Sequence, residues 1–147
     1  MIDIRITVPL LWVTALVLHL NTTLAADWAE EDGDVGAIRK VSNVQGGLVV
    51  HLGCGDGRLT AALVNRDRVL VQGLETDAVQ VAKARAYIQS LGLYGKVSVD
   101  HFDGRRLPYV DNLVNLVVDE TSGAVPVGEI LRVLAPGGVA CMRHDGV

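Results

Sequence analysis

The sequence predicts one α/β domain, built on a doubly wound, mostly parallel sheet that the chain carries through about five strands. Short runs of β-branched and apolar residues alternate with stretches of helical periodicity along residues 47–147. A glycine-rich turn joins the first of these runs to the helical stretch that follows. Because strands separated by helices pair in parallel through right-handed crossovers, we expect helices on both faces of the sheet.

Composition excludes several classes of protein. The chain has 147 residues, of which 50% are hydrophobic and 20% are charged, with a net charge of −4. A chain this apolar can offset the entropy of folding, so it is not a disordered protein. Its basic residues are scattered among acidic ones, which argues against a nucleic-acid partner. Two cysteines cannot form a disulfide framework, and we expect both to be free thiols.

Residues 1–26 have the layout of a secretory signal peptide. Arg5 lies in a short polar start, Ile6–Leu20 is almost entirely apolar, and small and polar residues follow up to Ala25 and Ala26. The apolar run is shorter than the roughly 20 residues that a membrane-spanning helix needs. We therefore expect cleavage near Ala25 or Ala26 and export to the periplasm or the outside of the cell, with an uncleaved membrane anchor as the alternative.

Residues 27–46 are expected to form an acidic linker and a short helix over Gly36–Val44, ahead of the domain at 47–147. The domain opens with a predicted strand, Leu48–Leu52, that runs into the turn Gly53–Gly57. Glycines let a backbone turn sharply and approach a ligand closely, and Asp56 can cap the helix that follows. A tight connection without any ligand remains the alternative at this point.

The spacing of the turn is G-x-G-x-G, and Arg58 stands where a dinucleotide fingerprint would have its third glycine. This weakens the prediction of a pyrophosphate ligand. A second predicted strand, Val69–Leu74, delivers Glu75 at its carboxyl end, twenty residues after Gly55. A carboxylate there can accept hydrogen bonds from the two hydroxyls of a ribose, so the pattern favours a nucleoside ligand, with a surface or capping acid as the alternative.

The rest of the chain continues the alternation. The expected elements are a helix from Asp77 to Gly92, strands at Val97–His101, Leu113–Val118 and Val139–Met142, and a short helix at Glu129–Leu134 ended by Pro136-Gly137-Gly138. The histidines share no ligand spacing, so we predict no metal site.

Taken together, these elements resemble the class I S-adenosylmethionine-dependent methyltransferases, a Rossmann-like family. The resemblance covers about residues 36–142 and lies in four stretches that occur in the family's order. They are Val50–Gly57, Glu75, Phe102-Asp103-Gly104 through Leu107-Pro108-Tyr109, and Ile130–Gly138.

The resemblance implies S-adenosylmethionine as the cofactor and a role for each matching residue. The turn residues Gly53, Cys54, Gly55 and Gly57 would shape the backbone under the methionine part. Glu75 would hold the ribose hydroxyls, Asp103 would meet the adenine amino group, and Asp119 would border the methyl donor. The catalytic residues and the methyl acceptor are not identified, although Asp119 or Glu120 could serve as a base by position.

Three departures from the family leave other functions open. His51 stands where the family usually has an acid, Asn115 stands where Asp is frequent, and the chain supplies five of the family's seven strands. One alternative is therefore a non-catalytic binding or scaffold module of an exported protein, and the chain is expected to be incomplete at its C-terminal end. A third hypothesis is an NAD-binding oxidoreductase domain, based on the glycine turn and Glu75.

The stretches Gly46–Leu63, Leu91–Val97 and Leu107–Leu113 also resemble exported bacterial proteins in which such a domain precedes a β-propeller of pyrroloquinoline-quinone-like repeats. That resemblance implies a downstream β-propeller as a partner in the same gene product. S-adenosylmethionine is a cytosolic metabolite, so an exported domain would need its donor to be supplied.

Overall fold

The computed structural model describes residues 35–64 and 68–143. Its strands are rich in β-branched residues, which pack well on a pleated surface. The strands are β1 (Gly47–Leu52), β2 (Val69–Glu75), β3 (Val97–His101), β4 (Val114–Asp119) and β5 (Leu134–Met142). The helices are α2 (Arg58–Ala62), α3 (Ala78–Ser90) and α4 (Val127–Val133), and another helix over residues 35–42 precedes β1.

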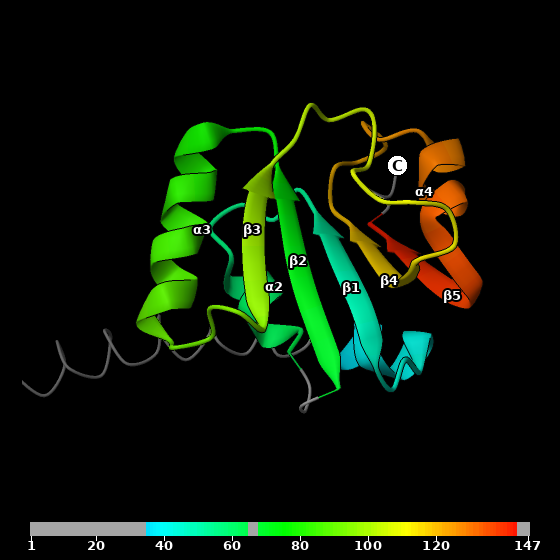
Figure 1. Ribbon diagram of the computed structural model, residues 1–147, viewed down its shortest axis with the longest axis horizontal. Helices are drawn as coiled ribbons and strands as arrows, with labels where there is room; N and C mark the ends of the chain where they lie inside the picture. The colour runs from blue at the N-terminus through cyan, green and yellow to red at the C-terminus, as the bar shows by residue number, and fades with distance from the viewer. Residues whose placement is uncertain (1–34, 65–67, 144–147) are drawn as a thin grey trace, which may run out of the picture.

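These strands form one parallel sheet in the order β3-β2-β1-β4-β5 (Figure 1). The chain first builds outward from β1 to β3, then returns to the other side of β1 and builds outward again through β4 and β5. The strand order therefore reverses between β1 and β4, which confirms the predicted doubly wound α/β fold. In such sheets ligands bind outside the carboxyl ends of the strands, near the point of reversal.

Each face of the sheet carries its own hydrophobic core, because successive side chains of a strand point to opposite faces. On one face Val49 of β1 packs with Val81 of α3, and on the other Val50 and Leu52 pack with Ile130 of α4. All of these side chains are buried. The burial of both faces explains why the strand sequences are nearly continuous apolar runs.

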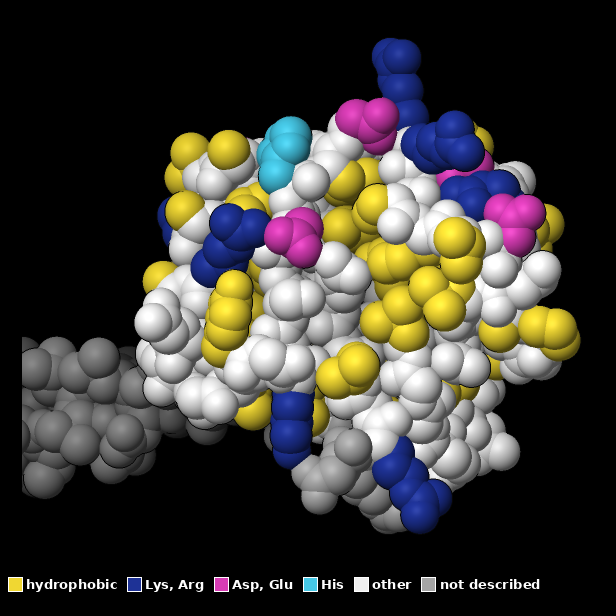
Figure 2. Space-filling view, in the orientation of Figure 1, with side chains coloured by type: hydrophobic (Ala, Val, Ile, Leu, Met, Phe, Trp, Pro, Cys, Tyr) yellow, Lys and Arg dark blue, Asp and Glu magenta, His cyan; other side chains and the backbone are white. Residues whose placement is uncertain are grey.

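The second face is also crossed by the connection between β3 and β4, residues 102–113. Hydrophobic side chains gather over this part of the molecule (Figure 2). Within the connection Leu107 is buried, whereas Val110 and Leu113 are exposed.

The ends of several elements differ from the prediction, and α4, for example, begins at Val127 rather than at Glu129. The first helix covers residues 35–42, not Gly36–Val44. Gly57 occupies the N-cap position of α2, and Asp56, one residue earlier, accepts a hydrogen bond from the backbone N–H of Arg58 at 3.2 Å. Strand β5 begins directly after α4 and carries an irregularity in its register with β4 between Val114 and Leu116. The predicted helix stop at residues 136–138 lies in this irregular part of β5, where extra residues are accommodated as in a β-bulge.

The predicted signal peptide, residues 1–26, and most of the predicted linker lie outside the described residues. Within residues 35–64 and 68–143, no helix is both long and apolar enough to cross a membrane.

Candidate cofactor-binding site

A pocket of about 230 Å³ lies at the carboxyl ends of four strands. Its walls come from the segments that follow β1, β2, β3 and β4, which approach one another although they are far apart in the sequence. The residues that line it are Gly53, Glu75, Thr76, Phe102, Gly104, Thr121, Ala124 and Val125. The pocket therefore lies where the reversal of strand order predicts a ligand.

The glycine turn after β1 forms one side of this site. Gly55 has φ +50°, and a Cβ atom placed on it would meet no other atom within 4 Å. Gly57 has φ +85°, and a Cβ atom there would lie 2.8 Å from the Cβ of Ala84 in α3. Helix packing therefore requires glycine at Gly57, whereas a Cβ atom at Gly55 would enter open space.

Glu75 faces the glycine turn from the end of β2. Its Oε2 accepts a hydrogen bond from the backbone N–H of Gly55 at 2.9 Å, and its Oε1 accepts from the N–H of Thr76 at 2.7 Å and of Asp77 at 3.2 Å. Partial burial raises the pKa of this carboxyl, but these hydrogen bonds outweigh burial and hold the pKa below its ordinary value. The side chain is thus an ionised acceptor.

The carboxylate of Glu75 still has acceptor capacity. Each carboxylate oxygen carries two lone pairs, and Oε2 receives one hydrogen bond, from Gly55. Glu75 also lines the pocket. The carboxylate of Glu75 therefore fits a ligand that offers hydroxyl donors at this edge of the sheet, as the ribose of the predicted cofactor does.

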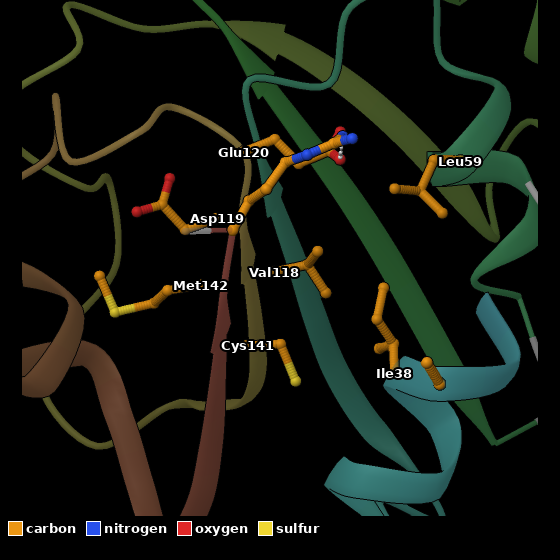
Figure 3. Close-up of a pocket in the computed structure, with 9 residues that line it drawn as sticks. Ile38, Leu59, Val118, Asp119, Glu120, Cys141 and Met142 are labelled. Carbon is orange, nitrogen blue, oxygen red and sulfur yellow. Dashed lines mark hydrogen bonds and ion pairs between the residues drawn. The ribbon is translucent and has the colours of Figure 1, made fainter. Parts of the chain in front are cut away.

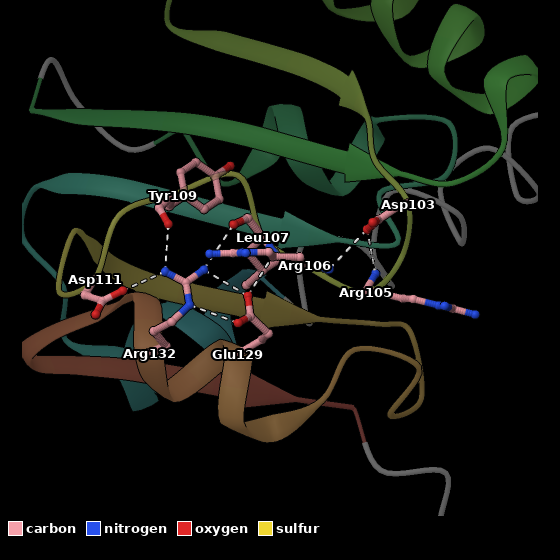
Figure 4. A network of polar contacts seen from close by, with 8 residues as sticks. All are labelled: Asp103, Arg105, Arg106, Leu107, Tyr109, Asp111, Glu129 and Arg132. Carbon is pink, nitrogen blue, oxygen red and sulfur yellow. Dashed lines mark hydrogen bonds and ion pairs between the residues drawn. The ribbon is translucent and has the colours of Figure 1, made fainter.

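Asp103 lies just after β3 and is exposed. Its Oδ1 accepts hydrogen bonds from the backbone N–H groups of Arg105 at 2.9 Å and Arg106 at 3.1 Å (Figure 4). These bonds hold the pKa of its carboxyl below the ordinary value. Its neighbours in the chain, Phe102 and Gly104, line the pocket, whereas Asp103 lies beside the pocket and is not one of its lining residues.

Two other predicted residues lie apart from the pocket. The side chain of Cys54 is buried in the core, and burial raises the pKa of its thiol to about 12. Its side chain therefore stays protonated and away from the pocket. Asp119 is buried at the end of β4 and lines a second cavity, of about 190 Å³, with Cys141 and Met142 of β5 (Figure 3). Its Oδ1 accepts hydrogen bonds from the N–H and hydroxyl of Thr121, at 2.9 and 2.6 Å.

The polar chain around His51 was not predictable from the sequence. This side chain is fully buried, with Nδ1 2.8 Å from the hydroxyl of Thr60 and Nε2 3.1 Å from the carboxylate of Glu120. Arg143 donates to the other oxygen of the same carboxylate at 2.9 Å. The hydrogen bond from His51 is the main cause that holds the pKa of Glu120 below its ordinary value, with Arg143 adding to it. His51 is thus a core residue with both ring nitrogens bonded, and it lies outside the pocket.

Comparison with known proteins agrees with this geometry. The family described as "Methyltransferase domain" matches residues 49–138. The methyltransferase GfsG of Streptomyces halstedii is 33% identical over 99 residues, which are 63% of this chain and 36% of that protein. The chain spans about half or less of the length of the curated relatives that it matches.

Solved structures share the fold. The [4+2]-cyclase SpnF is 26% identical, with a TM-score of 0.68 over 76% of this chain and 43% of that one. A SAM-dependent methyltransferase from Aquifex aeolicus is 19% identical, with a TM-score of 0.63 over 78% of this chain and 68% of that one. The family and its structural neighbours support S-adenosylmethionine as the cofactor. A match over residues 49–138, with the expected sheet and the expected pocket, shows that the chain belongs to the class I methyltransferase-domain family.

Proposed function

We propose that this domain binds S-adenosylmethionine in the pocket at the carboxyl ends of the strands and transfers its methyl group to an acceptor still to be identified. The observation that carries the proposal is the pairing of Glu75 with Gly55. An ionised carboxylate and an open backbone face each other there across two adjacent strand ends. Family membership supports the same conclusion.

Different residues of the site would bind different parts of the cofactor. The carboxylate of Glu75 would accept hydrogen bonds from the ribose hydroxyls, and the backbone around Gly55 would pass beneath the methionine part. Asp103, beside the pocket, would accept a hydrogen bond from the adenine amino group. Bound S-adenosylmethionine supplies a methyl group that its sulfonium already activates, so the protein has mainly to align donor and acceptor.

Asp119 and Glu120 remain the candidates for a base. Asp119 is buried and bonded to Thr121, whereas the side chain of Glu120 is 23% exposed. Both carboxylates line the second cavity rather than the cofactor pocket, and Glu120 is bonded to His51 and Arg143, so the geometry singles out neither as the base.

A non-catalytic module is the second candidate. It is favoured by His51, which stands where the family usually has an acid. This histidine is buried and bonded to Thr60 and Glu120. SpnF, which shares the fold, is described as a [4+2]-cyclase, so the fold alone does not fix the reaction. An NAD-binding oxidoreductase is the third candidate, and Arg58 at the position of the third fingerprint glycine weighs against it.

Calorimetric titration of the full-length protein with S-adenosylmethionine, S-adenosylhomocysteine and NADH tests these candidates. Saturable binding of the first two in the micromolar range, without binding of NADH, is the expected result. Binding of NADH alone would establish the third candidate, and a folded protein that binds none of the three would favour the non-catalytic module.

Export of the domain, with a β-propeller downstream in the same gene product, is also part of this proposal. It is supported by the three-part pattern of residues 1–26. N-terminal sequencing of the mature protein should begin at Ala26 or Asp27, whereas an intact Met1 would argue against cleavage.

A further inference from the structure

The connection between β3 and β4 crosses part of the sheet without forming a helix. These strands are separated in the sheet by β2 and β1, so residues 102–113 must cross two strands. Parallel crossovers are usually made by a helix, which satisfies its own backbone hydrogen bonds. Residues 102–113 form neither helix nor strand. Their backbone groups must therefore find partners elsewhere.

Arg132 of α4 supplies several of those partners (Figure 4). Its Nη2 donates to the carbonyl of Leu107 at 3.1 Å, and its Nη1 donates to the carbonyl of Tyr109 at 2.8 Å. Nη1 also bonds the carboxylate of Asp111 at 2.8 Å. A single guanidinium thus holds three residues of the connection, which its planar fork of donors makes possible.

Glu129, one turn earlier on α4, completes the arrangement. Its two carboxylate oxygens accept hydrogen bonds from Nε and Nη2 of Arg132, both at 2.9 Å. Oε2 also accepts from the backbone N–H of Leu107 at 3.1 Å. Leu107 is therefore held by both of its backbone groups, and its side chain is 1% exposed. We refer to Glu129 and Arg132 as the α4 clamp.

The held part of the connection lies next to the pocket wall. Phe102 and Gly104 line the pocket, and Leu107 follows Gly104 by three residues. On the other side, the backbone N–H of Phe102 donates to the carbonyl of Glu75 at 3.1 Å. The pocket wall is thus fixed at one end by β2 and at the other by the α4 clamp.

We propose that Arg132 and Glu129 are positioning residues for the nucleoside end of the cofactor, acting through the 102–113 connection rather than by contact. This inference rests on the proposed function. The clamp keeps Asp103 beside the pocket and Phe102 and Gly104 in the wall, so its loss lowers affinity without removing any group that touches the ligand.

The test is Arg132→Lys in the full-length protein. Lysine keeps the positive charge, but its single ammonium cannot reach two carbonyls and two carboxylates at once. Arg39→Lys is the matched control, because Arg39 also donates to two backbone carbonyls, those of Ala62 at 2.8 Å and Val64 at 3.3 Å, away from the connection. Glu129→Gln is the milder variant to use if Arg132→Lys does not fold.

Two measurements are made on each variant: calorimetric affinity for S-adenosylhomocysteine and amide hydrogen exchange at Leu107. Arg132→Lys should weaken affinity by roughly tenfold and speed exchange at Leu107, whereas Arg39→Lys should change neither. A folded clamp variant with wild-type affinity, or an equal loss of affinity in the control, would overturn the inference.

Failure of the proposed function gives a different result. If the wild-type protein does not bind S-adenosylhomocysteine, the proposed cofactor site is wrong and the inferred role in cofactor binding falls with it. Faster exchange at Leu107 in the clamp variant would then show only that the clamp holds the connection.

Discussion

Glu75 illustrates how one side chain can link structure and binding. Its carboxylate joins the turn after β1 to the start of α3, through Gly55 on one oxygen and Thr76 and Asp77 on the other. The same hydrogen bonds keep it ionised. A ligand hydroxyl therefore meets an acceptor that is already oriented, which limits the entropy lost on binding.

The first prediction concerns Glu75→Ala. This change should weaken the binding of S-adenosylhomocysteine by about 1 to 3 kcal/mol, because it removes hydrogen bonds to a charged acceptor. Calorimetric titration measures the effect. Asp77→Ala is the control, since Asp77 caps α3 by accepting from the N–H of Val79 at 2.8 Å and should affect stability but not affinity. Unchanged affinity in a folded Glu75→Ala protein would exclude the ribose role.

Other residue-scale contacts were not predictable from sequence. His51 and Glu120 are 69 residues apart, and no motif spacing relates them. Arg132 reaches Asp111 across 21 residues, and the motif around Arg132 indicated a helix and a family resemblance but not this contact. Such pairs depend on strand order and on which face each side chain occupies, and neither follows from local pattern.

At the scale of elements, the glycine turn meets two different demands. Its third glycine allows α2 to pack against α3, because a Cβ atom at Gly57 would lie 2.8 Å from Ala84. Its second glycine leaves an open space at Gly55. The sequence has glycine at both positions, but it does not show that the two glycines are needed for different reasons. Only the fold brings α3 against the turn at Gly57.

The second prediction separates these demands. Gly57→Ala should lower the free energy of unfolding by about 1 to 3 kcal/mol, through overpacking against Ala84 and backbone strain. Gly55→Val should fold with a smaller loss of about 1 to 2 kcal/mol, from its positive φ, and should abolish binding of S-adenosylhomocysteine. Urea unfolding and calorimetry measure the two effects. Retained binding by Gly55→Val would show that this part of the turn is only structural.

At the junction of α4 and β5 the predicted element boundaries were wrong. The predicted helix stop at Pro136-Gly137-Gly138 lies inside β5, which begins at Leu134. Pairing with β4 overrides the local preference, since Val114 pairs with Leu134 before the register irregularity and Leu116 pairs with Val139 after it.

For the whole molecule, each face of the sheet has its own hydrophobic core, and the α4 clamp adds polar contacts on the second face. The clamp makes the second face sensitive to acid. Hydrogen bonds from Arg132 and from the N–H of Leu107 lower the pKa of Glu129 from its ordinary 4.5 to about 2. A carboxyl with a lowered pKa in the folded state stabilises the fold above its unfolded pKa, and this contribution is lost as pH falls toward the folded pKa.

The third prediction follows from this shift. The stabilisation from Glu129 should be fully present above about pH 4.5 and should decline between pH 4.5 and 2. Thermal unfolding across this range should show a smaller dependence on pH for Glu129→Gln than for the wild-type protein, because glutamine does not titrate. The variant should also be less stable at neutral pH. Parallel curves for the two proteins would contradict the assignment.

Local periodicity and short spacings along the chain were enough to predict the fold class, the glycine turn and the position of Glu75, and the resemblance of four motifs indicated the family. Only the tertiary structure placed Glu75 against Gly55, turned Cys54 into the core and separated Asp119 from the pocket. It also revealed the clamp between α4 and the 102–113 connection. The physical reason is that parallel strands bring distant segments together at their carboxyl ends, and side-chain direction there is set by packing against those distant segments.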